Sequence, residues 1–189
     1  MQEIFEIELR YRLGSEVLAV EFGKNVLNQG FKVEASLSQE DIYYSSKHKD
    51  FIESEECLRI RTVDGRSEIT WKPPSTADMK VADEFWKEEV DLQIGSQHDI
   101  AKKMLNALDF FEVATVEKQR QSFVGPEGVE VSIDVVKGVG AFVELEVKHH
   151  DPDHGKRVIR RTAEGLGLAA SEICRTPYRD LVREANDAA

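Results

Sequence analysis

The stretch "EIFEIELRYRL", from Glu3 to Leu13, alternates strictly between two kinds of side chain. One parity carries the apolar and aromatic residues Phe5, Ile7, Leu9, Tyr11 and Leu13. The other parity carries the charged residues Glu6, Glu8, Arg10 and Arg12. Side chains of a β-strand point alternately to its two faces, so the stretch predicts a strand with one apolar and one charged face. The charged face either meets water as ordinary surface or lines a cavity that needs a ligand.

Six later stretches repeat this alternation: "CLRIRT", "EITWK", "KEEVDL", "VEKQRQSF", "VEVSID" and "FVELEVK". Their charged parity carries both signs, in Arg59, Arg61, Lys72, Lys87, Glu89, Asp91, Lys118, Arg120, Glu130, Asp134, Glu144, Glu146 and Lys148. For one strand, a solvated face is the favoured interpretation. For the whole set we favour a closed barrel, because long sheets tend to close and so remove exposed edges. Charges inside such a barrel must pair or bind a ligand of compensating charge.

Four segments have the apolar spacing of helices. The first follows a Ser15 cap, ends near Gly30 and directs inward Val17, Leu18, Phe22, Val26 and Leu27. The second follows Ser96 and directs inward Ile100, Met104, Leu105 and Leu108. The third directs inward Val158, Ile159, Ala163 and Leu166, and the fourth has Thr176 as N-cap and Pro177 in the first helical position. With hairpin turns at "DGR", "GPEG" and "KGVG", the sequence predicts one α+β domain, residues 1–189, around a large antiparallel sheet.

Composition restricts the classes of partner. The formal charge of -11 argues against nucleic acid as the main partner, because proteins bind nucleic acid through basic patches. It does not exclude small anions as ligands, because these respond to the local field of a cleft. No apolar run approaches the roughly 20 residues that span a bilayer, and the first residues lack a secretory pattern. We therefore expect a cytoplasmic protein without a membrane partner. The two cysteines, Cys57 and Cys174, have no spacing of a zinc site or disulfide framework.

The charged residues also suit a particular ligand. Glu6 with Glu8, and Glu144 with Glu146, offer the oxygen ligands that hard divalent cations prefer. Six cations, which suit phosphate oxygens, stand among the same strands: Arg10, Arg59, Arg61, Lys72, Lys118 and Arg120. The pattern is typical of a metal–polyphosphate site, although internal salt bridges could neutralise the same set.

In order along the chain, "EIELR", "QEDIYY", "LRIR", "TWKPP", "VEKQR", "IDVVKGVGAFVELE" and "PYRDLV" resemble the motifs of the CYTH family. This family, the triphosphate tunnel metalloenzymes, includes class IV adenylate cyclases, thiamine triphosphatases and inorganic triphosphatases. The resemblance covers nearly the whole chain and is closest to the bacterial class IV cyclases. It implies an eight-stranded antiparallel β-barrel, the triphosphate tunnel, with flanking helices.

The resemblance also implies residue roles. The metal ligands would be Glu6, Glu8, Glu144 and Glu146, with Asp134 as a direct or water-mediated ligand. The triphosphate would be held by Arg10, Arg59, Arg61, Lys72, Lys87, Lys118 and Arg120. The catalytic set would be Glu6, Glu8, Arg10, Lys72 and Asp134. Two departures stand out: Arg10 replaces the motif lysine, and Lys87, Glu89 and Asp91 replace an Arg-x-Glu-x-Glu strand.

We therefore expect an enzyme that uses Mg²⁺ or Mn²⁺ to act on a nucleoside triphosphate or another organic or inorganic triphosphate. The favoured activity is a class IV adenylate cyclase, which directs the ribose 3′-OH of ATP at the α-phosphorus and releases pyrophosphate. An inorganic or thiamine triphosphatase, which directs water at the terminal phosphorus, is the alternative. A binding module without catalysis is the second alternative, and a homodimer is left open.

Overall fold

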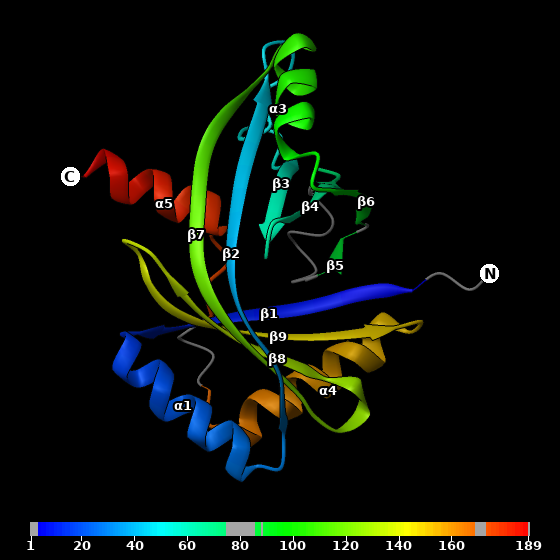
Figure 1. The fold of residues 1–189 in the computed structure, drawn as a ribbon. Helices are drawn as coiled ribbons and strands as arrows, with labels where there is room; N and C mark the ends of the chain where they lie inside the picture. Colours follow the sequence, from blue (N-terminus) through cyan, green and yellow to red (C-terminus); the bar gives the residue numbers. More distant parts are fainter. Residues whose placement is uncertain (1–3, 75–85, 88, 169–172, 189) are drawn as a thin grey trace. The chain divides into compact units, whose positions relative to one another are not determined.

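A computed structural model of the chain describes residues 4–74, 86–87, 89–168 and 173–188. The chain divides into two compact units, Met1–Leu37 with Lys118–Thr176, and Ser38–Glu117 with Pro177–Ala189. Two long strands, β2 (Lys32–Ser46) and β7 (Phe110–Val124), each run through both units. The fold is α+β, and its strands belong to one sheet (Figure 1).

In the first unit the strand order is β1-β9-β8-β7, and the paired strands run antiparallel. The further elements are β1 (Phe5–Gly14), α1 (Glu16–Asn28), η1 (Pro126–Gly128), β8 (Glu130–Val136), β9 (Gly140–His149) and α4 (Pro152–Gly165). Helices α1 and α4 pack on the same face of β1, β8 and β9 (Figure 1). The apolar parity of β1 lies beneath them, with Ile7 and Leu9 buried. The alternation is therefore confirmed from Phe5 to Tyr11; the register with β9 shifts between Arg12 and Gly14, and Glu3 lies outside the described residues.

In the second unit the order is β2-β3-β4-β6. Its further elements are β3 (Cys57–Val63), β4 (Arg66–Lys72), β5 (Trp86–Lys87), β6 (Val90–Gly95), α3 (His98–Ala107) and α5 (Tyr178–Asp187). The core consists of Ile42, Tyr44, Phe51, Leu58, Ile60, Ala101 and Leu105. Helix α3 thus covers the apolar face of β2 and β3. In the described parts of the chain, no helix is both long and apolar enough to cross a bilayer.

The motif "PYRDLV" has a structural role within the second unit. Arg179 of α5 is buried, and its Nη1 donates hydrogen bonds to the backbone carbonyls of Phe51 and Glu56, at 3.3 and 2.8 Å. Its other guanidinium nitrogens pair with Asp180. Because a buried guanidinium must be hydrogen-bonded, this residue fixes α5 to the segment between β2 and β3.

The expected α+β fold with an antiparallel sheet is confirmed, but the strand count differs. The stretch expected as one strand over residues 85–94 contains two strands, β5 and β6, so the described sheet has nine strands instead of eight. Part of this stretch lies outside the described residues. Among the described residues, the hydrogen-bonded strand order is linear, so the sheet is open.

The expected inward faces of two helices are only partly right: Val26 of α1 and Leu105 of α3 are buried as expected, but most of the other expected residues are exposed. Helix α1 buries Ala19, Gly23 and Val26, while Val17, at 68% exposure, and other large apolar residues face outward. Small residues bring this helix close to the sheet: a Cβ on Gly23 would lie only 3.5 Å from Ile133 Cδ1. Of the large apolar side chains of α1, Val26 is buried in the contact, whereas Val17, Leu18 and Leu27 lie outside it.

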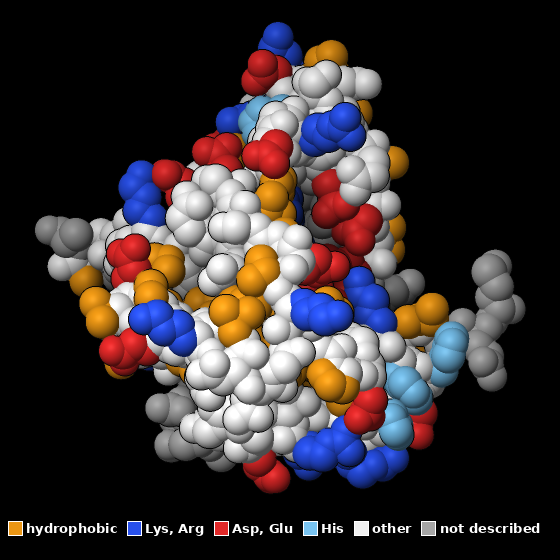
Figure 2. Space-filling model, turned by 60° about the horizontal axis from the view of Figure 1, so that its bottom comes forward, with side chains coloured by type: hydrophobic (Ala, Val, Ile, Leu, Met, Phe, Trp, Pro, Cys, Tyr) orange, Lys and Arg blue, Asp and Glu red, His pale blue; other side chains and the backbone are white. Residues whose placement is uncertain are grey.

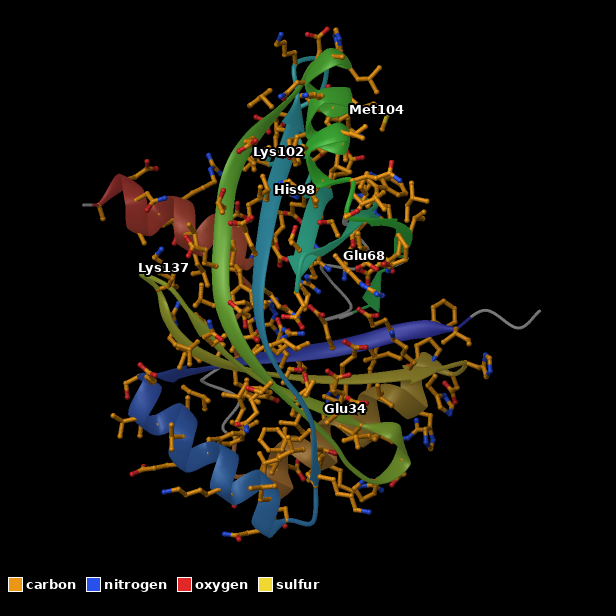
Figure 3. The ribbon with its side chains drawn as sticks, viewed as in Figure 1. Glu34, Glu68, His98, Lys102, Met104 and Lys137 are labelled. Atoms are coloured by element: carbon orange, nitrogen blue, oxygen red, sulfur yellow. The ribbon has the colours of Figure 1, made fainter. Side chains whose placement is uncertain are left out.

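Helix α3 behaves in the same way. It buries Ala101 and Leu105, whereas Ile100, Met104 and Leu108 are exposed; Figure 3 labels Met104 on the outer side of the helix. The inward face predicted for α4 is confirmed, since Val158, Ile159, Ala163 and Leu166 are all buried.

The helix starts agree in part. Ser15 caps α1, and its side chain accepts a hydrogen bond from Leu18 N–H at 3.3 Å. The N-caps of α3 and α5 are Gln97 and Pro177, one residue later than expected, and neither provides a side-chain hydrogen bond. Helix ends defined by propensity alone commonly shift by this much.

Gly155 marks a close approach of α4 to the sheet. A Cβ at this position would lie 2.7 Å from Ile7 Cδ1 and 3.3 Å from Val147 Cγ1, and Ile7 is fully buried. Helix propensity favours alanine by about 1 kcal/mol, but forcing a methyl into a packed core costs about 1–3 kcal/mol. We expect Gly155→Ala to lower the free energy of unfolding, measured in urea, by about 1 kcal/mol.

Gly165, near the end of α4, provides the matched control. No atom lies within 4 Å of a Cβ built there, so Gly165→Ala should not destabilise the protein. Adding Ile7→Val to Gly155→Ala removes the clashing Cδ1 and should recover part of the loss. A Gly155→Ala protein as stable as the wild type would contradict the close packing.

Glu56 is a buried carboxylate in the second unit and gives a pH prediction. Burial opposes its ionisation, but hydrogen bonds from Lys49 and Ser54 outweigh this and lower the pKa of Glu56. A lowered folded-state pKa means that this stabilisation is present above the ordinary value of 4.5 and is lost as the pH falls through the folded-state pKa. We expect Glu56→Gln to cost about 1 kcal/mol at pH 7 and to lose less stability than the wild type between pH 5 and pH 3.

The control for this prediction is Glu53→Gln, which alters an exposed carboxylate three residues earlier. Because its side chain is exposed, this change should alter the free energy of unfolding at pH 7 by less than about 0.5 kcal/mol. Identical slopes for wild type and Glu56→Gln would show that Glu56 is not the titrating group.

Candidate functional site

The charged parity of the first unit forms one continuous face across three strands. Residues opposite each other on antiparallel strands point to the same face. The register places Glu8 opposite Glu146, and Glu146 opposite Glu130. One step further along, Arg10 lies opposite Glu144. Because Ile7 and Leu9 point to the helices, this face is the one that α1 and α4 leave uncovered.

One part of this face is a dense ion-pair network. Arg120 holds Asp134 with both ends of its guanidinium, at 2.7 Å for Nε–Oδ1 and 2.5 Å for Nη2–Oδ2. Lys118 Nζ lies 3.0 Å from Asp134 Oδ2, and both residues are buried. Glu144 pairs with Arg10, at 2.8 Å for Nε–Oε1, and with Arg120 Nη2. Three cations thus face one direction, held in place by two carboxylates.

The cations of this network strongly stabilise the ionised form of Glu144. Burial opposes ionisation of Glu144, but Arg120, Arg10 and Lys118 outweigh it and hold the pKa of Glu144 well below its usual range. Glu144 is therefore ionised at neutral pH and orients the two arginines.

The neighbouring part of the face is acidic. It contains Glu6, Glu8, Glu130 and Glu146, with Lys148 as a nearby cation. Burial and the charges of Glu6, Glu130 and Glu8 raise the pKa of Glu146 to about 7, although Lys148 opposes the shift. Lys148 contacts Glu6 and Glu146, and Arg10 Nη2 lies 3.8 Å from Glu8 Oε1, so this part of the face brings four carboxylates together with two cations.

The donor set of the acidic part fits a hard divalent cation, because carboxylate oxygens are the ligands that Mg²⁺ and Mn²⁺ prefer. In the described residues, no group of three His, Cys, Asp or Glu side chains is already positioned to hold an ion. The structure divides the predicted metal ligands: Glu6, Glu8 and Glu146 lie in the acidic part, whereas Glu144 and Asp134 lie in the ion-pair network.

The second unit carries its own charged face. Asp41 is fully buried and accepts two hydrogen bonds from Arg61, at 2.7 and 2.8 Å. Glu89 lies 3.4 Å from Arg59 Nη2 and 3.1 Å from Lys72 Nζ. Burial disfavours charge on Arg59, but Asp41 outweighs this and raises the pKa of Arg59. Three of the predicted phosphate ligands thus share one face; the side chain of Lys87 lies outside the described residues.

Three acidic residues of these faces had no role in the predicted site. Glu130 shares a parity with Asp134, but only the register shows that it lies opposite Glu146. Asp41, in the motif "QEDIYY", accepts two hydrogen bonds from Arg61 and so positions it. Glu68, labelled on β4 in Figure 3, lies opposite Arg61 in the register. In the sequence, only their position on the charged parity of a strand indicated that they belong to these faces.

The histidines near the start of α4 serve local structure. They gather at one edge of the surface in Figure 2, where His149 and His154 stack with ring centroids 4.5 Å apart. His149 Nδ1 accepts a hydrogen bond from Asp151 N–H at 2.9 Å, and the Asp151 side chain caps α4. These contacts give His149, His154 and Asp151 a local structural role at the start of α4.

Comparisons with known proteins identify the family. The chain belongs to the CYTH family: the profile described as "CYTH domain" matches residues 5–177. A relative from Methanocaldococcus jannaschii, named "Putative adenylate cyclase MJ0240", is 30% identical over 181 residues, covering 94% of this chain and 98% of its own. The expected family is therefore confirmed.

Solved structures show the same fold. The PH1012 protein of Pyrococcus horikoshii matches with a TM-score of 0.79 and 24% identity, over 94% of this chain and 99% of its own. A Hippeastrum protein, named "Putative adenylyl cyclase HpAC1" and described as having a dominant triphosphatase activity, matches with a TM-score of 0.67 and 16% identity, over 96% of each chain.

Proposed function

We propose that this chain is a divalent-metal-dependent enzyme that acts on a triphosphate, and that it works as one domain over residues 1–189. The observation that carries the proposal lies in the first unit. An acidic group of four carboxylates stands beside three oriented cations on the face of β1, β7, β8 and β9 that α1 and α4 do not cover. Phosphoryl chemistry requires this combination of metal-binding oxygens and anion-binding cations more than it requires a covalent nucleophile.

The residues have distinct roles in this proposal. Glu6, Glu8 and Glu146 would hold Mg²⁺ or Mn²⁺, which supplies Lewis-acid polarisation and charge neutralisation when bound. Glu144 and Asp134 position Arg10, Lys118 and Arg120 for phosphate oxygens. A direct role of Glu144 and Asp134 as metal ligands remains a proposal. The assignment of Arg59, Arg61, Lys72 and Lys87 to the triphosphate is also a proposal.

The preformed salt bridges make the cationic group ready for an anion. Arg10 and Arg120 already have their guanidinium planes fixed by carboxylates, so little side-chain entropy is lost when phosphate binds. Buried Lys118 adds a positive charge that water does not screen.

Within this function we favour a class IV adenylate cyclase. The support is the name of the Methanocaldococcus jannaschii relative and the resemblance of the motifs to the bacterial cyclases. The cyclase and the triphosphatase require the same phosphate-binding residues and differ in where the nucleophile stands. The activity described for the Hippeastrum protein makes triphosphatase the second candidate.

One assay separates the candidates. The protein is incubated with ATP, tripolyphosphate or thiamine triphosphate, each with Mg²⁺ or Mn²⁺. Cyclic AMP and pyrophosphate from ATP would support the cyclase, and orthophosphate from any of the three would support a triphosphatase. Tight binding without product would contradict an enzyme and favour the binding module.

A further inference from the structure

Lys148 occupies an unusual place at the edge of the acidic group. It lies on β9, two residues after Glu146 and opposite Glu6 in the register. Its Nζ is 3.4 Å from Glu6 Oε2 and 3.5 Å from Glu146 Oε1. A single ammonium therefore bridges two carboxylates that the proposed function assigns to the metal.

The contacts of Lys148 are looser than those of the other cations on this face. Arg10, Lys118 and Arg120 are largely buried and each has at least one carboxylate contact of 3.0 Å or less, although Arg10 Nη2 also lies 3.8 Å from Glu8 Oε1. The side chain of Lys148 is 64% exposed, and both of its contacts exceed the usual length of a hydrogen bond. A long, flexible and strongly hydrated side chain of this kind can leave at little cost.

We propose that Lys148 is a built-in competitor of the divalent cation. In the metal-free protein its ammonium partly neutralises Glu6 and Glu146, and a divalent cation must displace it to reach the same oxygens. Lysine contact and metal binding are then mutually exclusive at this pair, and Lys148 sets the metal concentration at which the site fills. This inference rests on the proposed metal site.

The first test measures Mn²⁺ binding without any triphosphate, from the electron paramagnetic resonance signal of free Mn²⁺. Lys148→Met removes the ammonium but keeps an unbranched side chain. Two exposed ion pairs and one like charge beside the metal are lost, so the Kd should fall on the order of tenfold. The matched control is Lys24→Met, which removes the same charge from an exposed position on α1 and should leave the Kd unchanged.

A third variant separates this inference from the proposed function. Glu146→Gln should weaken Mn²⁺ binding strongly. If it does, but Lys148→Met binds Mn²⁺ no more tightly than wild type, Lys148 is not a competitor and the metal site stands. If Glu146→Gln binds Mn²⁺ like the wild type, the metal assignment is overturned and the role of Lys148 with it.

The second test uses the wild-type protein and does not depend on how a variant folds. Lys148 is labelled with a limiting amount of an amine-acetylating reagent, with and without saturating Mg²⁺, and the labelled fraction is measured by peptide mass spectrometry. Release from Glu6 and Glu146 should raise the labelling of Lys148 several-fold, while that of Lys24 stays constant. Equal labelling of Lys148 in both conditions would overturn the proposal.

Discussion

Replacing Glu8 with glutamine is expected to reduce metal-dependent turnover of the triphosphate by at least about 100-fold. Glu8 lies opposite Glu146 in the register and shares the acidic group with Glu6 and Glu130. The substitution keeps the size of the side chain but removes one negative charge and the stronger oxygen ligand. Initial rates at saturating triphosphate over a range of Mn²⁺ concentrations measure the effect.

The same substitution at Glu34 is the control. Glu34, labelled in Figure 3, is an exposed residue of β2. Glu34→Gln should retain the wild-type rate. Glu6→Gln should match Glu8→Gln, because both carboxylates are assigned to the same ion. Full turnover in either of these two variants would remove the acidic group from the catalytic site.

Asp134→Ala is expected to lower the free energy of unfolding by about 3–5 kcal/mol. Asp134 is fully buried and is the shared partner of Lys118 and Arg120. Its removal takes one carboxylate away from the buried Lys118 ammonium, and breaking a buried ion pair on one side is strongly destabilising. Urea unfolding followed by circular dichroism measures the change.

Two variants show whether charge or packing causes this loss. Asp153→Ala alters an exposed aspartate of α4 and should change the free energy of unfolding by less than about 0.5 kcal/mol. Asp134→Leu combined with Lys118→Met removes both charges from the buried position and should be less destabilising than Asp134→Ala. If the double variant is the less stable one, the pairing argument is wrong.

Much of the fold could be predicted from the sequence because strand alternation is a local signal. Period-two patterning requires no knowledge of neighbouring strands, so Glu6, Glu8 and Arg10 were correctly placed on one face. The inward faces of α1 and α3 could not be predicted in this way. Small residues such as Ala19 and Gly23 permit the closest approach, and an apolar pattern alone does not distinguish close contact from the flanks of a helix.

Which glutamates come together in the site depends on the register between strands, and register is not encoded in any one stretch of sequence. The sequence contains Glu130, Glu144 and Glu146 in similar patterns, yet only pairing between strands separates them. Glu130 and Glu146 come together across β8 and β9, whereas Glu144 is bound to Arg10 and Arg120. The family resemblance implies ligands for a triphosphate, but only the register separates Glu130 and Glu146 from the ion-paired Glu144.

The register of β1 with β9 also has an evolutionary consequence. Inserting one residue within β1 would exchange its two faces beyond that point, turning carboxylates toward α4 and apolar side chains toward the charged group. Such an insertion would damage the core and the site in a single event. Descendants of this gene should therefore gain or lose residues in turns, such as that at Asp64 and Gly65, and keep the length of β1 constant.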